Sequence, residues 1–160
     1  MSFVARPPMP VAPETNSADE PIINDGFFPD VNPLTVRTVG RISTAVPPER
    51  LRAAIIAAIM TVERDLTEWA NLQRAAGYTS LADVPGVVID GLSRLLQLYQ
   101  RAVTLYAKAE LIERTRDFDT TAAGGKAVDE LTESVGDLRR DAAHAVRDML
   151  GRSRTIVELI

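Results

Sequence analysis

Residues 92–121 read LSRLLQLYQRAVTLYAKAELIERTRDFDTT, and this stretch, without glycine or proline, decides the fold. Apolar side chains recur along it at steps of three and four residues, which is the spacing of one face of an α-helix. That face carries Leu92, Leu95, Tyr99, Ala102, Tyr106 and Ala109, with Glu113 at its end. Leu98, Leu105 and Leu111 add apolar groups on the other side, and a helix that is apolar over most of its circumference is normally buried. We therefore predict a central helix, roughly 40 Å long at about 1.5 Å per residue, within a small helical bundle.

The composition of the whole chain limits the functions that it can have. The 160 residues are enough for one domain with a single core, and 46% of them are hydrophobic. A net charge of −4 argues against a general DNA binder, because such proteins are usually basic. The absence of cysteine excludes disulfides and thiolate metal sites, and a single histidine removes most histidine-based triads. No apolar run reaches the ~18–20 residues that a membrane span needs, so we expect no membrane partner.

The N-terminal part of the chain is rich in proline. Residues 1–26 hold five of the ten prolines, and proline opposes both helix and central strand because it lacks a backbone donor. We predict an extended arm over 1–26 without a core of its own. This arm is either a floppy tail or a segment that orders against a neighbouring subunit. In residues 27–46, apolar side chains are expected to anchor the chain on the bundle, with a short strand or irregular turn at 35–39.

A second long helix is predicted near residues 48–76. Pro47 and Pro48 open it, since proline suits a first helical turn, and Gly77 suits the left-handed position after its last turn. Its apolar face comprises Leu51, Ile55, Ile59, Val62, Leu66, Trp69 and Leu72. We interpret Trp69 as a core or interface anchor. In the connection that follows, Ser80 to Asp83 form a capping-box-like turn, and Asp90 is expected to cap the central helix.

The last predicted helix covers residues 126–150, and Gly151 stops it. Its apolar positions are Val128, Leu131, Val135, Leu138, Ala142, Ala145 and Met149. The three helices near 48–76, 92–119 and 126–150 give an all-α fold. We expect a small bundle of long helices over 27–151, with the extended N-terminal arm on one side and a C-terminal tail over 152–160 on the other.

Some residues have the spacing of ligand sites, but in each case a structural role explains them better. Asp117 and Asp119 form a D-x-D pair without a third ligand nearby, so capping or solvation of the helix end is favoured over a divalent metal. Gly124-Gly125-Lys126 lacks the spacing of a phosphate-binding loop and the strand that precedes one. We therefore predict no cofactor and no metal.

Catalytic groups are equally poorly supported. His144 lies between alanines on the last helix, where a half-buried or surface role is expected. Glu110 and Glu113 stand in a cluster of charges of both signs, together with Lys108, Arg114 and Arg116. At helical spacing, ion pairs within the helix or between subunits explain this cluster better than an acid/base pair. We predict no enzymatic activity.

The C-terminal tail is apolar, although it follows a helix stop and a charged R-S-R segment. Such a terminal peptide either folds back on its own core or docks on a partner, and docking is our preferred interpretation. The residues that we expect to bind a partner are Arg152, Arg154, Ile156, Val157, Leu159 and Ile160.

Several blocks of the chain, taken in order, resemble one protein family. They are Phe27-Phe28-Pro29-Asp30, Glu68-Trp69, Ala75-Ala76-Gly77-Tyr78, Ser80-Leu81-Ala82-Asp83-Val84-Pro85, RAVTLYAKAELIERTRD at 101–117, Asp119-Thr120-Thr121, Leu138-Arg139-Arg140-Asp141-Ala142, Arg147 to Arg152, and Val157-Glu158-Leu159-Ile160. The ordered set covers about residues 27–160 and resembles the tailed-phage head completion/stabilisation protein family (GPL type).

The resemblance implies a structural virion protein and no enzyme. Such a protein acts after DNA packaging, joins the portal vertex and forms a connector ring, which similarity to head–tail adaptors implies to be dodecameric. The implied partners are the portal protein, further copies of the chain, neck or tail-terminator proteins, and packaged DNA passing through the channel. The implied location is the head–tail junction of the virion, after assembly in the host cytoplasm. The tail is then expected to dock on the portal. The alternatives are a small helical protein-binding regulator and an enzyme that uses the carboxylate cluster.

Overall fold

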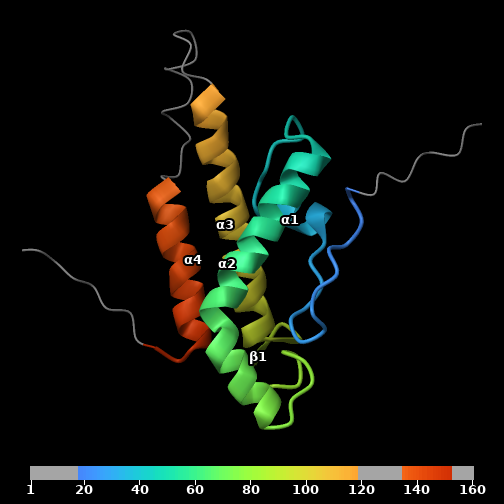
Figure 1. Ribbon diagram of the computed structural model, residues 1–160, viewed down its shortest axis with the longest axis vertical. Coiled ribbons are helices and arrows are strands. Elements are labelled where there is room, and N and C mark those ends of the chain that lie inside the picture. The colour runs from blue at the N-terminus through green and yellow to red at the C-terminus, as the bar shows by residue number, and fades with distance from the viewer. Residues whose placement is uncertain (1–17, 119–134, 153–160) are drawn as a thin grey trace, which may run out of the picture.

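The computed structural model describes residues 18–118 and 135–152 of the chain (Figure 1). Within these ranges it contains four helices and one two-stranded hairpin. The elements are α1 (Pro33–Val39), α2 (Pro48–Ala75), β1 (Val88–Ile89), β2 (Leu92–Ser93), α3 (Arg94–Phe118) and α4 (Val135–Met149). The described residues are mainly helical, as predicted, but the β1–β2 hairpin departs from the all-α fold expected from the sequence. None of the described helices is long and apolar enough to cross a membrane.

The long helix α3 occupies the centre of the molecule. It packs against α2 on one side and α4 on the other, whereas α2 and α4 hardly touch each other. The three helices alternate in direction, so the C-terminal ends of α2 and α4 and the start of α3 lie at the same end of the bundle, which is the lower end in Figure 1. The central role predicted for this stretch is therefore correct.

Helix α2 begins and ends where the sequence predicts. Pro48 stands in its first turn, and Gly77 adopts a φ of +96° just past its end, where the Tyr78 amide donates to the Gln73 carbonyl over 3.2 Å. The residues predicted for its inner face are buried from Leu51 to Leu66. Leu72 is an error of the prediction, because it is 68% exposed. Leu72 belongs to the last turns of α2, which extend past the end of α4 (Figure 1).

The start of α3 differs from the prediction. Leu92 and Ser93 form strand β2, which pairs antiparallel with β1, and the helix begins only at Arg94. Asp90 and Gly91 adopt φ values of 52° and 74°. An Asp-Gly pair with positive φ at both positions makes the tight turn that matches the twist of a two-residue hairpin. Asp90 is therefore a hairpin residue, and the prediction that it caps the central helix is wrong.

The segment before α1 also differs from the prediction. Ile22 and Val31 exchange backbone hydrogen bonds of 2.8 and 3.0 Å, and Ala18, Ile22 and Phe27 are buried. Residues 18–26 thus lie on the bundle and do not belong to an arm without a core. Residues 1–17 of the predicted arm lie outside the described residues.

Helix α1 replaces the strand or turn predicted at 35–39. The Asn32 side chain accepts hydrogen bonds from the Leu34 and Thr35 amides, and Pro33 follows it as the first helical residue. This is a standard helix start, in which an Asn side chain satisfies amides that have no partner within the helix.

Helix α4 covers α3 with an apolar face. Leu138, Ala142, Ala145 and Met149 are buried as the sequence predicts, and they face α3 because α4 packs mainly on that helix. Gly151, at a φ of +66°, ends the helix as predicted, and the Arg152 amide donates to the Arg147 carbonyl over 3.0 Å. Residues 126–134 of the predicted last helix lie outside the described residues.

Candidate functional site

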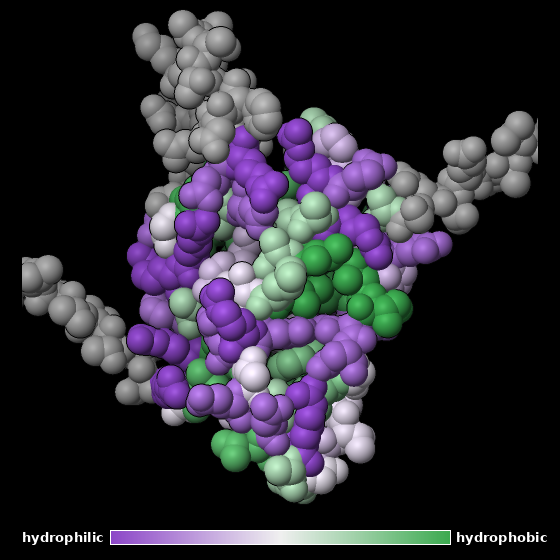
Figure 2. All heavy atoms as spheres, viewed as in Figure 1, coloured by the Kyte–Doolittle hydropathy of each residue, from purple (hydrophilic) through white to green (hydrophobic). Residues whose placement is uncertain are grey.

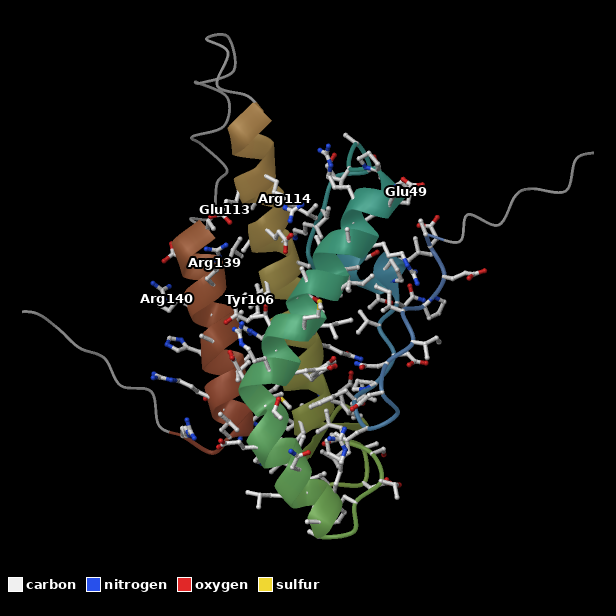
Figure 3. All side chains as sticks on the ribbon, viewed as in Figure 1. Glu49, Tyr106, Glu113, Arg114, Arg139 and Arg140 are labelled. Carbon is white, nitrogen blue, oxygen red and sulfur yellow. The ribbon has the colours of Figure 1, made fainter. Side chains whose placement is uncertain are left out.

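Three residues of the charged cluster at the end of α3, Glu110, Glu113 and Arg114, are engaged in ion pairs. Glu110 pairs with Arg114 one turn later over 2.8 Å, as predicted for an intra-helix pair. Glu113 reaches across to Arg139 of α4 over 2.5 Å, and Figure 3 shows these two side chains directed toward one another. These pairs are largely exposed, and exposed pairs contribute little each. The arrangement links α3 to α4 and does not place an acid/base pair in a cleft.

The candidate ligand residues are placed as follows. His144 is half-buried on α4, in agreement with its predicted structural role. Among the described residues no group of three His, Asp or Glu side chains comes close enough together to hold a metal ion. Asp119 and Gly124 to Lys126 lie outside the described residues.

A polar cluster joins the N-terminal segment to both long helices. The Asn24 amide nitrogen donates to the Glu63 carboxylate of α2 over 2.7 Å and to the Tyr99 hydroxyl of α3 over 2.9 Å. The Tyr99 hydroxyl in turn donates to Glu63 over 2.8 Å. Burial, together with the nearby Glu63 carboxylate, raises the pKa of Tyr99 well above its ordinary value, so the hydroxyl stays a donor. We call Asn24, Glu63 and Tyr99 the hydrogen-bond hub.

The Phe27-Phe28 pair fixes the same segment by apolar contacts. Phe28 stacks on the Tyr99 ring, with centroids 5.1 Å apart, and Phe27 lies edge-on to Trp69 at 6.5 Å. Arg74 lies over the Phe27 ring at 4.6 Å and also pairs with Asp25. Trp69 is half-buried against the core, which agrees with its predicted role as an anchor.

Asp25 holds the turn that presents the two phenylalanines. Its carboxylate accepts hydrogen bonds of 2.9 and 3.0 Å from the Phe27 and Phe28 amides. Burial works to raise the pKa of Asp25, but these two amides and Arg74 outweigh it and lower the pKa below its ordinary value. The loop of residues 24–28, which we call the clamp, therefore fixes the N-terminal segment on α2 and α3 and is not a reactive site.

The β1–β2 hairpin presents apolar side chains to solvent. We call Val87, Val88, Ile89 and Leu92 the hairpin patch; they are between 51% and 65% exposed. The hairpin is held firmly on its inner side, because Gln97 donates to the Ile89 carbonyl over 2.6 Å and the Arg94 amide donates to the Val87 carbonyl over 2.8 Å. The sequence carried a signal for this surface, namely an Asp-Gly pair between apolar residues. Helical periodicity through Leu92 obscured that signal.

A second apolar surface lies on the outer side of α2. Arg52 donates to the Glu20 carbonyl over 2.6 Å, and Asn24 donates to Glu63, so residues 20–24 run beside α2 from one contact to the other. Ile23 points away from the core and is 75% exposed. We call Ile23, Ile56 and Met60 the α2 patch, since the last two lie one turn apart on the exposed side of the helix. Figure 2 shows apolar residues gathered beside α2 and this segment on the face turned to the viewer.

The C-terminal tail is described only at its root. Arg152 is exposed just beyond α4, at the same end of the bundle as the hairpin (Figure 1). The other predicted docking residues, Arg154, Ile156, Val157, Leu159 and Ile160, lie outside the described residues, so the docking interpretation stays a prediction.

Comparison with known proteins places the chain in one family. The family described as phage head completion protein (GPL) matches residues 22–160. The head completion/stabilization protein of Escherichia phage P2 is 41% identical over 145 residues, which cover 90% of this chain and 86% of that protein. The probable head completion/stabilization protein of Haemophilus phage HP1 is 31% identical over 146 residues, covering 89% of this chain and 93% of that protein. No solved structure matches the chain.

These relatives agree with the absence of a reactive cluster among the described residues, because the family is one of structural phage proteins and not of enzymes. Neither relative's name supports the alternative of a small regulator. The match runs from the hydrophobic residues of the clamp through all four described helices to the end of the sequence. The chain therefore belongs to the phage head completion protein (GPL) family.

Proposed function

We propose that this protein completes the phage head by forming a ring of identical subunits on the portal vertex, between the portal and the tail. The observation that carries this proposal is the family match over residues 22–160, with relatives named head completion/stabilization proteins. Two exposed apolar patches on one small domain support it, because a monomer gains nothing from leaving such surfaces in water. The ring is assembled in the host cytoplasm and stays in the virion as a platform for neck or tail-terminator proteins.

The C-terminal tail is the part of the chain that we assign to the portal. Gly151 ends α4 at a φ of +66°, so the chain can leave the bundle there. Arg152 and Arg154 can form charge-assisted hydrogen bonds with acidic groups of the portal. Fully burying each of the four apolar side chains that follow is worth about 1.5–3 kcal/mol. Ordering the backbone costs about 1–2 kcal/mol per residue, so one tail binds weakly and a ring of linked tails binds well.

Deleting residues 155–160 tests this assignment. The truncated chain is expected to keep its helical circular dichroism spectrum and its urea midpoint, because a tail that binds the portal adds nothing to the core of its own subunit. It is also expected to lose attachment to portal-bearing heads in a sedimentation assay. If the truncated chain unfolds, the tail belongs to its own core. If it attaches as well as the full chain, the portal is bound by another surface.

Packaged DNA is expected to pass through the ring without being gripped. The chain carries a net charge of −4, and several exposed arginines are already paired with carboxylates, among them Arg139 with Glu113 and Arg140 with Asp137. This pairing lowers the number of cations that can neutralise phosphates, and phosphate contacts supply most of the affinity for duplex DNA. Sub-micromolar binding of duplex DNA by the isolated subunit at physiological salt would contradict this expectation.

A further inference from the structure

The hairpin patch has the properties of a surface that a partner covers. Both residues of β1 are exposed, so the hairpin carries solvent-exposed apolar groups on both of its faces. A two-stranded hairpin is marginal by itself in water, and an exposed apolar strand is a surface that proteins normally protect. Here the inner contacts from Gln97 and Arg94 hold it in one conformation, so a partner binds it without an added cost of ordering.

The α2 patch offers a complementary surface elsewhere on the same chain. It is apolar and lies on a rigid helix, with an arginine at each end. Arg52, one turn before Ile56, bonds to the Glu20 carbonyl, and Arg64, one turn beyond Met60, pairs with the neighbouring Asp65 over 3.4 Å while its side chain stays 74% exposed. At the tip of the hairpin patch, Asp90 makes no ion pair with another described residue. Apolar groups beside an acidic residue thus match apolar groups beside a basic residue, and opposite charges favour this pairing over like-on-like contact.

We propose that the hairpin patch of one subunit docks on the α2 patch of the next copy of this chain. Contact between two different surfaces is heterologous, and it closes into a ring when the rotation between subunits permits. Contact of either patch with itself gives only pairs. The inference rests on the proposed ring and names the contact that builds it. The two patches supply the apolar centre of an interface whose standard size is about 800 Å² per partner.

Because the chain has no cysteine, directed crosslinking tests this contact cleanly. Heads are assembled with a mixture of a tagged Met60→Cys chain and an untagged Ile89→Cys chain, then treated with a bismaleimide. The matched control replaces Met60→Cys by Leu72→Cys, since Leu72 lies on the same helix and is 68% exposed against 67% for Met60. The expected product is a mixed dimer of one tagged and one untagged chain, at a much lower level in the control.

Dimers of two Ile89→Cys chains or of two Met60→Cys chains as the main product would overturn the proposal, as would a mixed dimer no more abundant than in the control. A second measurement uses charge. Ile89→Asp and Met60→Asp are each expected to keep the helical spectrum and to lose incorporation into heads, whereas Leu72→Asp keeps both. Normal incorporation of the first two variants would also overturn the contact. If microscopy finds a ring on the portal but these tests fail, only this inference falls; if wild-type protein forms no ring there, the proposed function falls with it.

Discussion

The Tyr99→Phe substitution isolates the hydrogen-bond hub from the packing around it. Phenylalanine keeps the buried ring and its stacking on Phe28, whose centroid lies 5.1 Å away at an interplanar angle of 13°. Only the hydroxyl is lost, and with it the 2.8 Å bond to Glu63 and the 2.9 Å bond from Asn24. The change therefore measures what the hub contributes to holding the N-terminal segment against α2 and α3.

The expected loss in the free energy of unfolding depends on two facts: Glu63 is a charged acceptor, and Asn24 and Glu63 keep each other as partners. A hydrogen bond to a charged group contributes about 1.5–3 kcal/mol to stability. Asn24 and Glu63 remain bonded to each other over 2.7 Å, so neither group is left without a partner when the hydroxyl is removed. The loss should then lie near the lower end, at about 1.5–2 kcal/mol, which is roughly a tenfold to thirtyfold change in the folding equilibrium.

Urea unfolding followed by the fluorescence of Trp69 measures this loss, because Trp69 is the one tryptophan of the chain and contacts Phe27 beside the hub. The midpoint should fall while the slope of the transition stays unchanged. Tyr106→Phe is the matched control, since Tyr106 is a half-buried residue of the same helix whose hydroxyl bonds to no other described residue. A loss under about 0.5 kcal/mol for Tyr99→Phe, or one equal to the control, would refute the role of the hub.

Two further predictions concern single residues of the fold. Asp25→Asn should make stability less sensitive to acid. Because the pKa of Asp25 is lowered in the folded protein, the unfolded chain takes up the proton first as pH falls. The Asp25 carboxylate therefore stabilises the protein at neutral pH, and this contribution is lost as pH falls below about 5. Urea midpoints at neutral and acid pH should therefore converge for the variant, and parallel curves for both proteins would contradict this. Gly40→Ala should cost about 1–3 kcal/mol, because a Cβ there would lie 2.8 Å from the Val36 carbonyl oxygen. Gly86→Ala, whose Cβ would meet nothing closer than 3.8 Å, is the control and should be nearly neutral in the same assay.

Much of the helical fold could be predicted from the sequence, because its signals are local. Helix α2 is fixed by Pro48 at its start, Gly77 past its end and a regular apolar face between them. The buried side of α4 follows from the spacing of Leu138, Ala142, Ala145 and Met149 in the same way. These features depend on residues within a few positions of each other, which periodicity and capping rules describe.

The segment before α1 could not be predicted, because its place is decided by distant partners. Asn24 bonds to a side chain 39 residues later and to another 75 residues later. Proline content indicated only that the segment is not a helix or a central strand. The hairpin was missed for a different reason. Apolar spacing carried the predicted helix through Leu92, but the turn at Asp90 and Gly91 requires both residues at positive φ and ends the helical pattern there.

The candidate docking surfaces also differ in whether the sequence reveals them. The apolar tail over 152–160 was identified from composition alone, and its docking remains a prediction. The α2 patch could not be identified from the sequence. Ile56 and Met60 look like ordinary apolar residues of a helix, and Ile23 is exposed only because Ile22 pairs with Val31 and turns its neighbour outward. Exposure of this kind depends on tertiary packing, which local pattern does not report.

Electron microscopy of DNA-filled heads carrying this protein tests the central claim most directly. Reconstruction of the portal vertex should show a closed ring on the portal in which each repeat accommodates α2, α3 and α4 as they pack here. Heads made without the protein should lack that ring and leave the portal bare. Finding the chain elsewhere on the head, or at the portal vertex as a single copy, would contradict the account.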